Sequence, residues 1–158
     1  MAQDELNFDD QGIAPQGWRE WWLTIQALFW LIIIDWAVKR FGFGRTTRAL
    51  ARYLQKAERV TSPPRLPVVW RWAGVMLFAN RRIKLHPVAC LAESMMLWFL
   101  LRRRGAPAHL LVGVRTLTGF ESHAWVTYQG RVLNDFEDAI AIYTPLDLPL
   151  LRPKRETS

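Results

Sequence analysis

The chain has 158 residues, half of them hydrophobic, a net charge of +7 and a single cysteine. This length fits one domain with a sizeable core and excludes a multi-domain enzyme, and the apolar content excludes wholesale disorder. One cysteine cannot form an internal disulfide, and four acidic residues among the first ten do not fit a cleavable secretory signal, so we expect a cytoplasmic protein.

The first predicted element is a long apolar helix. Residues 1–17 are polar and contain glycine and proline, so we interpret them as a flexible lead-in. Residues 21–38 are apolar at fifteen of eighteen positions, and tryptophans flank the run. This length and these aromatic ends are typical of a transmembrane helix. Asp35 inside the run would be costly in hydrocarbon, so we favour burial or membrane-surface association over a true span.

A basic helix is predicted next. Residues 39–59 carry a net charge of +6, and leucine and alanine recur among them at three- and four-residue spacing. This pattern predicts an amphipathic helix, separated from the first by Gly42 and Gly44 and capped by Thr46 or Thr47. No nucleic-acid-binding motif accompanies the basic block, so we interpret it as a solvated helix face and expect no nucleic-acid partner.

Two more helices are predicted before the pattern changes, over residues 67–82 and 87–104. The second has Pro87 in its first turn and Gly105 after three arginines, which are start and stop signals. It is apolar nearly all round and should therefore be central.

Three strands are predicted in the last third of the chain. Residues 110–116, 122–128 and 131–136 are short, rich in β-branched and aromatic side chains, and separated by Gly119 and Gly130. Helices followed by an antiparallel sheet indicate the α+β class.

Three residues within these elements suggest nucleophilic chemistry. Cys90 lies near the start of the central helix, where the dipole favours a thiolate, although a lone cysteine in an apolar helix is often structural. His123 and Asp135 lie on the two strands that meet near Gly130. A three-residue loop would place them opposite each other, with the carboxylate orienting the imidazole. A two-residue turn at Gln129 and Gly130 would pair position 124 with 135 and separate the two side chains.

A metal site is the weaker interpretation of the same region. His86 and Cys90 are four residues apart, and His109 and His123 are further candidate ligands. Their spacing matches no paired-ligand pattern, and His86 precedes a proline that disfavours helical geometry. We therefore expect no metal and no cofactor.

Several short motifs resemble one protein family. They are Cys90-Leu91-Ala92-Glu93-Ser94, Arg104-Gly105, Val112-Gly113-Val114-Arg115, Ser122-His123-Ala124-Trp125-Val126 and Val132-Leu133-Asn134-Asp135. Together they resemble the transglutaminase-like leader peptidases of lasso-peptide biosynthesis, the stand-alone protease subunit of the maturase. The resemblance covers about residues 21–146, although Ser122 stands where the family often has alanine and Glu93 stands at a variable position.

The resemblance implies a transglutaminase/papain-like fold with the Cys-bearing helix packed on a small antiparallel sheet. It divides the chain into the lead-in 1–17, a hydrophobic and a basic helix over 18–62, a catalytic core over 63–152 and a tail over 153–158. It also implies a cysteine peptidase in which Cys90 is the nucleophile, His123 the general base and acid, and Asp135 the orienting carboxylate.

The implied function is removal of the leader peptide from a lasso-peptide precursor before macrolactam formation. The implied partners are the precursor peptide, a small leader-binding recognition protein and a lasso cyclase, with membrane-surface association through residues 21–38 left open. Two alternatives remain at this point. One is an acyltransferase or amidase with the same three residue types, and the other is a non-catalytic membrane-tethered adaptor with a structural cysteine.

Overall fold

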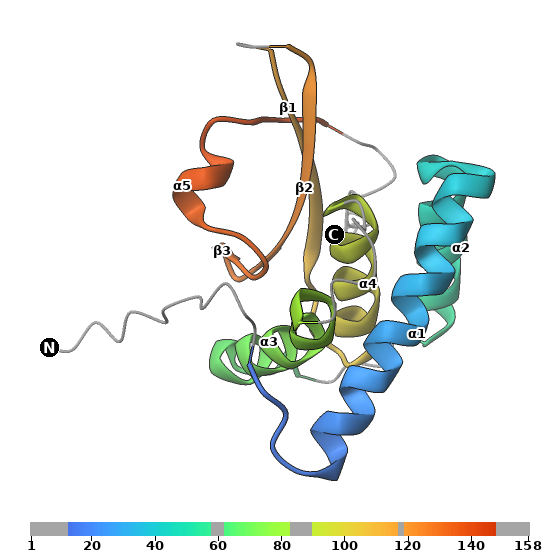
Figure 1. Ribbon diagram of the computed structural model, residues 1–158, viewed down its shortest axis with the longest axis vertical. Helices are drawn as coiled ribbons and strands as arrows, with labels where there is room; N and C mark the ends of the chain where they lie inside the picture. The colour runs from blue at the N-terminus through green and yellow to red at the C-terminus, as the bar shows by residue number, and fades with distance from the viewer. Residues whose placement is uncertain (1–12, 58–61, 83–89, 117–118, 148–158) are drawn as a thin grey trace, which may run out of the picture.

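The computed structural model describes residues 13–57, 62–82, 90–116 and 119–147 (Figure 1). The helices are α1 (Trp18–Phe41), α2 (Phe43–Ala57), α3 (Leu66–Arg82), α4 (Cys90–Arg103) and α5 (Glu137–Ile140), and the strands are β1 (His109–Arg115), β2 (Glu121–Tyr128), β3 (Arg131–Val132) and β4 (Thr144–Pro145). Helices pack on one four-stranded antiparallel sheet, which confirms the predicted α+β class. The first two predicted strands lie within two residues of β1 and β2. The third, predicted over 131–136, was too long, because β3 ends at Val132. α5 and β4 had no clear sequence signal.

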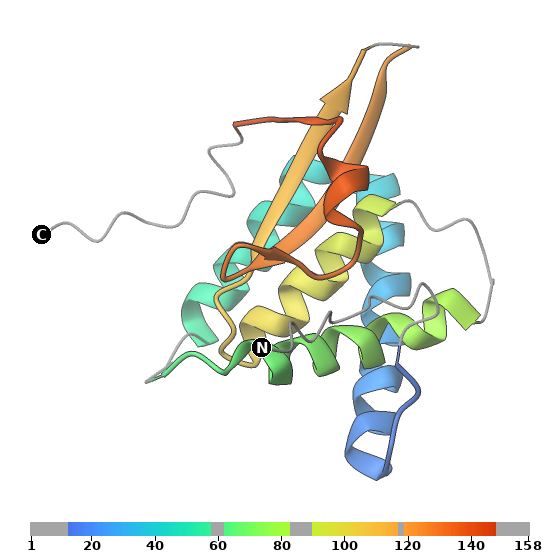
Figure 2. The same ribbon diagram turned by 90° about the vertical axis from the view of Figure 1, so that its left-hand side faces the viewer.

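Helix α4 is the centre of the molecule, as its composition predicted. It lies between the α1–α2 pair and the sheet, while α3 crosses beneath it (Figures 1 and 2). Nine of its fourteen residues are buried, which an apolar surface on all sides allows. It ends where predicted, because Gly105 has a φ of 82° and the Ala106 N–H donates to the Leu101 carbonyl at 3.0 Å, which closes the last turn.

Helix α1 has one side in the hydrophobic core. Leu23, Ala27, Leu31 and Ile34 recur at three- and four-residue spacing and are each at most 4% exposed, against α3 and α4. The helix is long and apolar enough to cross a membrane by length and composition, but this buried side is part of the same core as the rest of the protein.

The junction between α1 and α2 differs from the prediction. Gly42, at a φ of 83°, ends α1, but Gly44 lies inside α2. Thr46 and Thr47 do not cap α2, because their hydroxyls donate back to the carbonyls of Gly42 and Phe43, at 2.9 and 2.8 Å. A single glycine with a positive φ is enough to turn the chain, so the second helix begins at once.

The sheet has the strand order β3-β2-β1-β4. β1 pairs with β2 along its whole length, from His109 opposite Thr127 to Arg115 opposite Glu121. β4 adds only two pairs on the outer edge of β1. The even-numbered residues of β2 face α4, since Ala124, Val126 and Tyr128 are at most 1% exposed and the latter two belong to the core.

The turn between β2 and β3 is the shorter of the two turns considered from the sequence. Tyr128 pairs with Arg131, so the loop is a two-residue turn in which Gln129 and Gly130 have φ values of 49° and 77°. These two positive values are typical of a type I′ turn. In this register position 124, not His123, would lie opposite Asp135 if the ladder continued. The ladder stops at Val132, so its register does not set the position of Asp135.

Some predicted features lie at or beyond the limits of the described residues. Ile13, within the expected lead-in, donates its N–H to the Gly74 carbonyl of α3 at 3.0 Å, so this residue contacts the helical body. Pro87, expected in the first turn of α4, and the tail 153–158 lie outside the described residues.

Candidate active site

The site begins where β3 ends. From that point, the edge of β2 that faces away from β1 has no neighbouring strand. Two side chains take over the hydrogen bonds of that edge. The Val126 N–H donates to Asn134 Oδ1 at 2.8 Å, and the Ala124 carbonyl accepts from Ser94 Oγ, also at 2.8 Å. One backbone bond remains beyond β3, from the Leu133 N–H to the Val126 carbonyl. Side chains thus replace the ladder at the point where the chain bends away.

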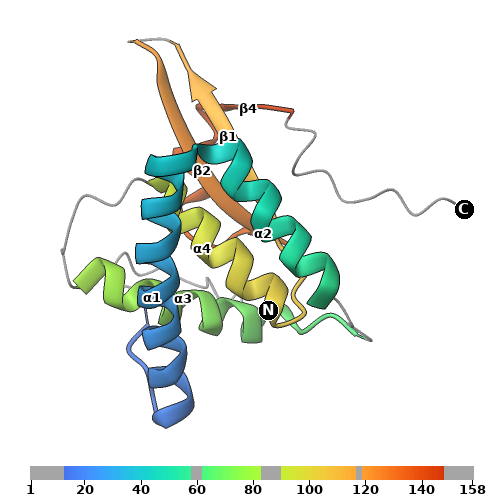
Figure 3. The same ribbon diagram turned by 90° about the vertical axis from the view of Figure 1, so that its right-hand side faces the viewer.

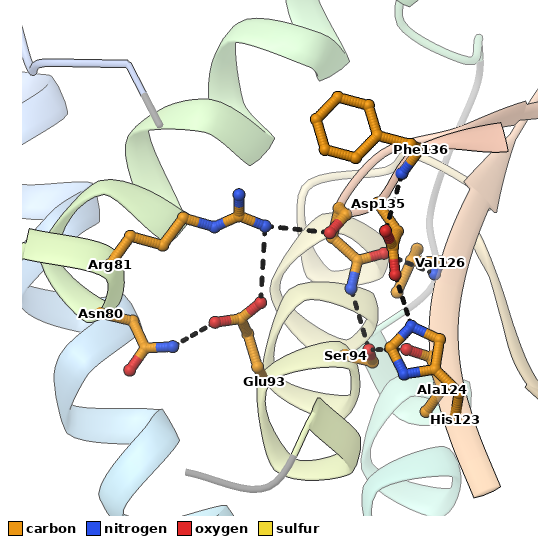
Figure 4. Close-up of polar contacts among 10 residues, drawn as sticks. Asn80, Arg81, Glu93, Ser94, His123, Ala124, Val126, Asp135 and Phe136 are labelled. Atoms are coloured by element: carbon orange, nitrogen blue, oxygen red, sulfur yellow. Dashed lines mark hydrogen bonds and ion pairs between the residues drawn. The ribbon is translucent and has the colours of Figure 1, made fainter. Parts of the chain in front are cut away.

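Asn134 and Ser94 join the three segments that carry the candidate residues. The Asn134 amide donates to Ser94 Oγ at 2.9 Å, and both residues are buried, at 7% and 0% exposed. Ser94 is one turn after Cys90 on α4, Ala124 follows His123 on β2, and Asn134 precedes Asp135. Figure 4 shows Ser94, Ala124, His123 and Asp135, with dashed lines for the hydrogen bonds of Ser94. The pair therefore fixes the spacing between helix, strand and loop, and we call it the Ser94–Asn134 clamp.

His123 and Asp135 are in direct contact despite the two-residue turn. His123 Nε2 and Asp135 Oδ2 form a hydrogen-bonded pair (Figure 4). The other carboxylate oxygen, Oδ1, accepts the Phe136 N–H at 2.8 Å, which fixes the orientation of the carboxylate. The bend after Val132 brings Asp135 beside His123, whereas a continued strand would have separated them. The predicted proximity is thus confirmed, and the expectation that a two-residue turn would separate the two side chains is wrong.

Cys90 is the first described residue of α4 and is exposed. A hydrogen bond with His123 lowers the pKa of the Cys90 thiol below its usual range, against the opposing effect of partial burial. Backbone hydrogen bonds from Ala124 and Leu91 lower this pKa further. The first comes from the β2 edge that β3 leaves open, and the second from the start of a helix, where N–H groups lack partners.

The pKa of the His123 imidazole shifts in the opposite direction, upward. The hydrogen bond with Cys90, and then the one with Asp135, raise the pKa of His123 to about 9, although partial burial acts against them. A lowered thiol pKa beside a raised imidazole pKa favours a thiolate–imidazolium pair at neutral pH. Because Nε2 faces Asp135, Nδ1 is the nitrogen left for Cys90.

Two aromatic residues surround the His123 ring. Trp125 stacks at 6.2 Å between ring centroids, and Tyr143 lies at 5.2 Å. Both depend on Gly113, the residue of β1 opposite His123, because a Cβ there would come within 2.7 Å of the Trp125 ring and 2.9 Å of Tyr143. The missing side chain therefore permits the packing that holds the imidazole.

A polar cluster ties α3 to the site. The Arg81 guanidinium donates to the Asn134 carbonyl at 2.9 Å and lies 3.8 Å from the carboxylate of Glu93, which also accepts from Asn80 (Figure 4). Glu93 is three residues after Cys90 and is largely buried. Arg81 thus holds the backbone next to Asp135 from a third direction.

Of the remaining metal candidates, His109 lies away from this site. His109 lies at the far end of β1, opposite Thr127, and burial followed by the charge of Arg102 lowers its pKa. His86 lies outside the described residues. Among the residues that the structure describes, no group of three or more His, Cys, Asp or Glu side chains is arranged to hold a metal ion.

Sequence reasoning missed the positioning residues. Ser94 and Asn134 were noted only as members of motifs, and Arg81 was not singled out. One signal was present, since Ser94 is four residues after Cys90 and must lie on the same face of α4. Asn134 and Arg81 had no such signal, because their roles depend on where β3 ends.

One comparison with known proteins identifies the family of this chain. A family model described as the transglutaminase-like superfamily matches residues 30–147, which include the second half of α1, all later described elements and the three candidate residues. Comparisons with curated proteins and with solved structures give no match. Since the family match covers well over half of the chain, the protein belongs to the transglutaminase-like superfamily.

Proposed function

We propose that the protein is a cysteine peptidase that removes the leader peptide from a lasso-peptide precursor. The observation that carries the proposal is the hydrogen-bonded pair of His123 and Asp135. An exposed Cys90, whose pKa is lowered chiefly by His123, accompanies this pair. Members of a triad need this arrangement, in which a carboxylate orients an imidazole and the imidazole activates a nucleophile. The exposure of Cys90 leaves the sulfur accessible to a peptide.

The proposed reaction follows from the protonation states. The Cys90 thiolate attacks the carbonyl carbon of the last leader residue and forms a tetrahedral intermediate. The Cys90 N–H is the proposed oxyanion donor, since it lies at the start of α4. Imidazolium Nδ1 of His123 protonates the departing amine, the C–N bond breaks, and a thioester remains. Water, deprotonated by His123, hydrolyses the thioester and restores the thiolate.

The substrate class is supported by the motifs around these residues, which resemble those of lasso-peptide leader peptidases. The amine released from the core peptide would be the group that a cyclase joins to a side-chain carboxylate. We further propose that a small leader-binding protein presents the precursor, and that the reaction takes place in the cytoplasm.

Mass spectrometry of a lasso precursor incubated with this protein and a leader-binding partner tests the proposal. We expect two products, leader and core, whose masses add to the precursor plus one water. Cys90→Ala should give neither product, and Ser122→Ala, which changes an exposed neighbour of His123 outside the triad, should cleave normally. Cleavage by Cys90→Ala at the wild-type rate would refute the proposed nucleophile.

Family membership is equally compatible with acyl transfer, and the same assay separates the two reactions. When a small primary amine is added in excess, a transferase gives a leader that carries the amine, whereas a hydrolase gives the free acid. We expect the free acid. A leader–amide as the main product would establish the acyltransferase alternative.

A further inference from the structure

The solvent-facing side of α1 is apolar. Seven large side chains on it are between 52% and 76% exposed: Trp18, Trp21, Trp22, Ile25, Phe29, Ile32 and Trp36. Their three- and four-residue spacing places them on one side of the helix, opposite the buried stripe. We call these seven residues the outer stripe. Single exposed apolar residues are common in soluble proteins, but a continuous row of this size marks an interaction surface.

The opposite side of α1 is fixed to the protein. Arg71 of α3 donates two hydrogen bonds to Glu20, at 2.7 and 2.8 Å, and Thr24 Oγ1 lies 3.3 Å from the Val75 carbonyl. Leu23 and Ala27, at most 2% exposed, are part of the core. A transmembrane orientation would break these contacts. The outer stripe is therefore a surface of the folded protein.

Positive charge lies beside the outer stripe. Arg45, Arg48 and Arg52 are exposed on the side of α2 that faces away from the buried Leu50 and Leu54. The sequence of α2 contains no acidic residue. Helices α1 and α2 both lie on the same side of α4, in front of it in Figure 3, so their outward sides face in the same general direction.

Further cations border the same surface. Lys39 and Arg40 are exposed at the C-terminal end of the outer stripe. Arg103 of α4 lies over the rings of Trp30 and Tyr53, at 5.9 and 5.8 Å from their centroids, which places another cation between α1 and α2. The acidic groups of α1 have partners, since Asp35 pairs with Lys39 at 2.6 Å and Glu20 with Arg71.

We propose that this surface, the outer stripe together with the arginines of α2, binds an anionic lipid bilayer. Helix α1 lies in the plane of the membrane, with its outer stripe among the upper acyl chains and the arginines at the level of the lipid phosphates. An apolar helix face rich in tryptophan and bordered by cations has the chemistry of an in-plane membrane helix. No polar side chain interrupts the stripe from Trp18 to Trp36, which suits hydrocarbon better than the polar rim of a protein interface.

Flotation of the purified full-length protein with vesicles tests this proposal independently of catalysis. The vesicles contain phosphatidylcholine alone or phosphatidylcholine mixed with phosphatidylglycerol. We expect binding to the anionic vesicles, with a blue shift of tryptophan fluorescence. The double variant Phe29→Gln and Ile32→Gln should bind at least about tenfold more weakly, because two apolar groups no longer enter the acyl chains.

The matched control is Val68→Gln combined with Phe120→Gln, which removes two exposed apolar side chains elsewhere and should leave binding unchanged. Circular dichroism and thermal unfolding verify that each variant is folded. The triple variant Arg45→Gln, Arg48→Gln and Arg52→Gln should lose about a hundredfold on anionic vesicles and little on neutral ones, and added salt should reproduce this loss in the wild type.

Three results would overturn the proposal. The first is wild-type protein that stays in solution with anionic vesicles. The second is a double variant, with Phe29 and Ile32 replaced, that binds as strongly as the wild type. The third is a dimer in light scattering that becomes monomeric in the double variant, since a second copy of the chain would then cover the outer stripe.

Discussion

On one edge of β2 the backbone pairs with β1 along seven residue pairs, whereas on the other edge it pairs with β3 at only two. Beyond Val132 the β3 edge is completed by Asn134, Ser94 and Cys90. A regular ladder places every residue at a position fixed by the pleat, but it leaves no backbone group for a ligand or a thiolate. The interrupted edge provides such groups and lets the chain bend. The β1 edge thus supports the fold, and the β3 edge builds the site.

The largest effect on activity is expected on the β3 edge. His123→Ala should reduce kcat/KM for leader removal by at least about 10⁴-fold, because both activation of the thiol and protonation of the amine are lost. The variant should remain folded at the assay temperature, since the side chain is partly exposed and lies outside the main core. A loss of activity explained entirely by unfolding would contradict the assignment of the site to the β3 edge and of the fold to the β1 edge.

A substitution on the β1 edge should reduce stability strongly and activity little. Leu110→Ala removes a side chain that is 1% exposed, beside Val126 in the sheet, and should lower the free energy of unfolding by about 2–5 kcal/mol. Denaturant titration measures this change. Turnover below the unfolding transition should stay within about threefold of wild type, since no hydrogen bond of the site involves this residue. A selective loss of kcat in a fully folded variant would show that the two edges are coupled.

Asn134 contributes both to the stability of the fold and to the geometry of the site. Its replacement should therefore affect both stability and activity. Asn134→Ala leaves the buried Val126 N–H without its acceptor and should lower the free energy of unfolding by about 1–3 kcal/mol. It also frees one support of Asp135, so kcat should fall more than KM rises. Asn134→Asp keeps the acceptor for Val126 but loses the donor to Ser94, and we expect it to recover part of the stability. If both variants kept the wild-type kcat, the clamp would be structural only.

The thiolate–imidazolium pair predicts the dependence on pH. kcat/KM should decrease as the pH rises through about 9, where His123 loses its proton, and at low pH, where the Cys90 thiolate is protonated. In Cys90→Ala the pKa of His123, measured by NMR, should fall, because the hydrogen bond with Cys90 is the largest cause of its increase. A raised pKa stabilises the fold below the ordinary histidine pKa of about 6.5, and this contribution disappears as the pH rises through about 9. An unchanged His123 pKa in Cys90→Ala would exclude the pair.

The smallest effect is expected at the turn that starts β3. Gly130→Ala should lower the free energy of unfolding by roughly 1 kcal/mol, because its φ of 77° is unfavourable for a residue with a Cβ. Gln129→Asn should stabilise the turn by a few tenths of a kcal/mol, since asparagine tolerates a positive φ better. Neither change should alter kcat, because the clamp, not the turn, places Asp135. A large kcat effect with unchanged stability would show that the turn sets the position of Asp135.

The sequence was sufficient for features that depend on local periodicity. An apolar surface on all sides predicted the central position of α4, and Gly105 predicted its end. The strand pattern predicted β1 and β2. The close approach of His123 and Asp135 was also predicted, but by a register that the structure does not have. A prediction from residue spacing along a hairpin assumes a continuous ladder. The ladder ends at Val132, and beyond it the side-chain amide of Asn134 takes the place of a backbone partner for Val126. Such an exchange depends on Ser94, forty residues away, and leaves no periodic signal.

The packing of α1 has a consequence for how the chain is synthesised. The core side of α1 is covered by α3 and α4, and 62 residues, 42–103, must be added after Phe41 before α4 is complete. At roughly 5–20 residues per second, a ribosome needs about 3–12 s to produce them. During that interval both sides of an apolar helix are exposed on the nascent chain. Solubility during synthesis is therefore set by what contacts α1 before α4 has emerged, and slower translation of residues 42–103 should increase aggregation even though the finished fold is unchanged.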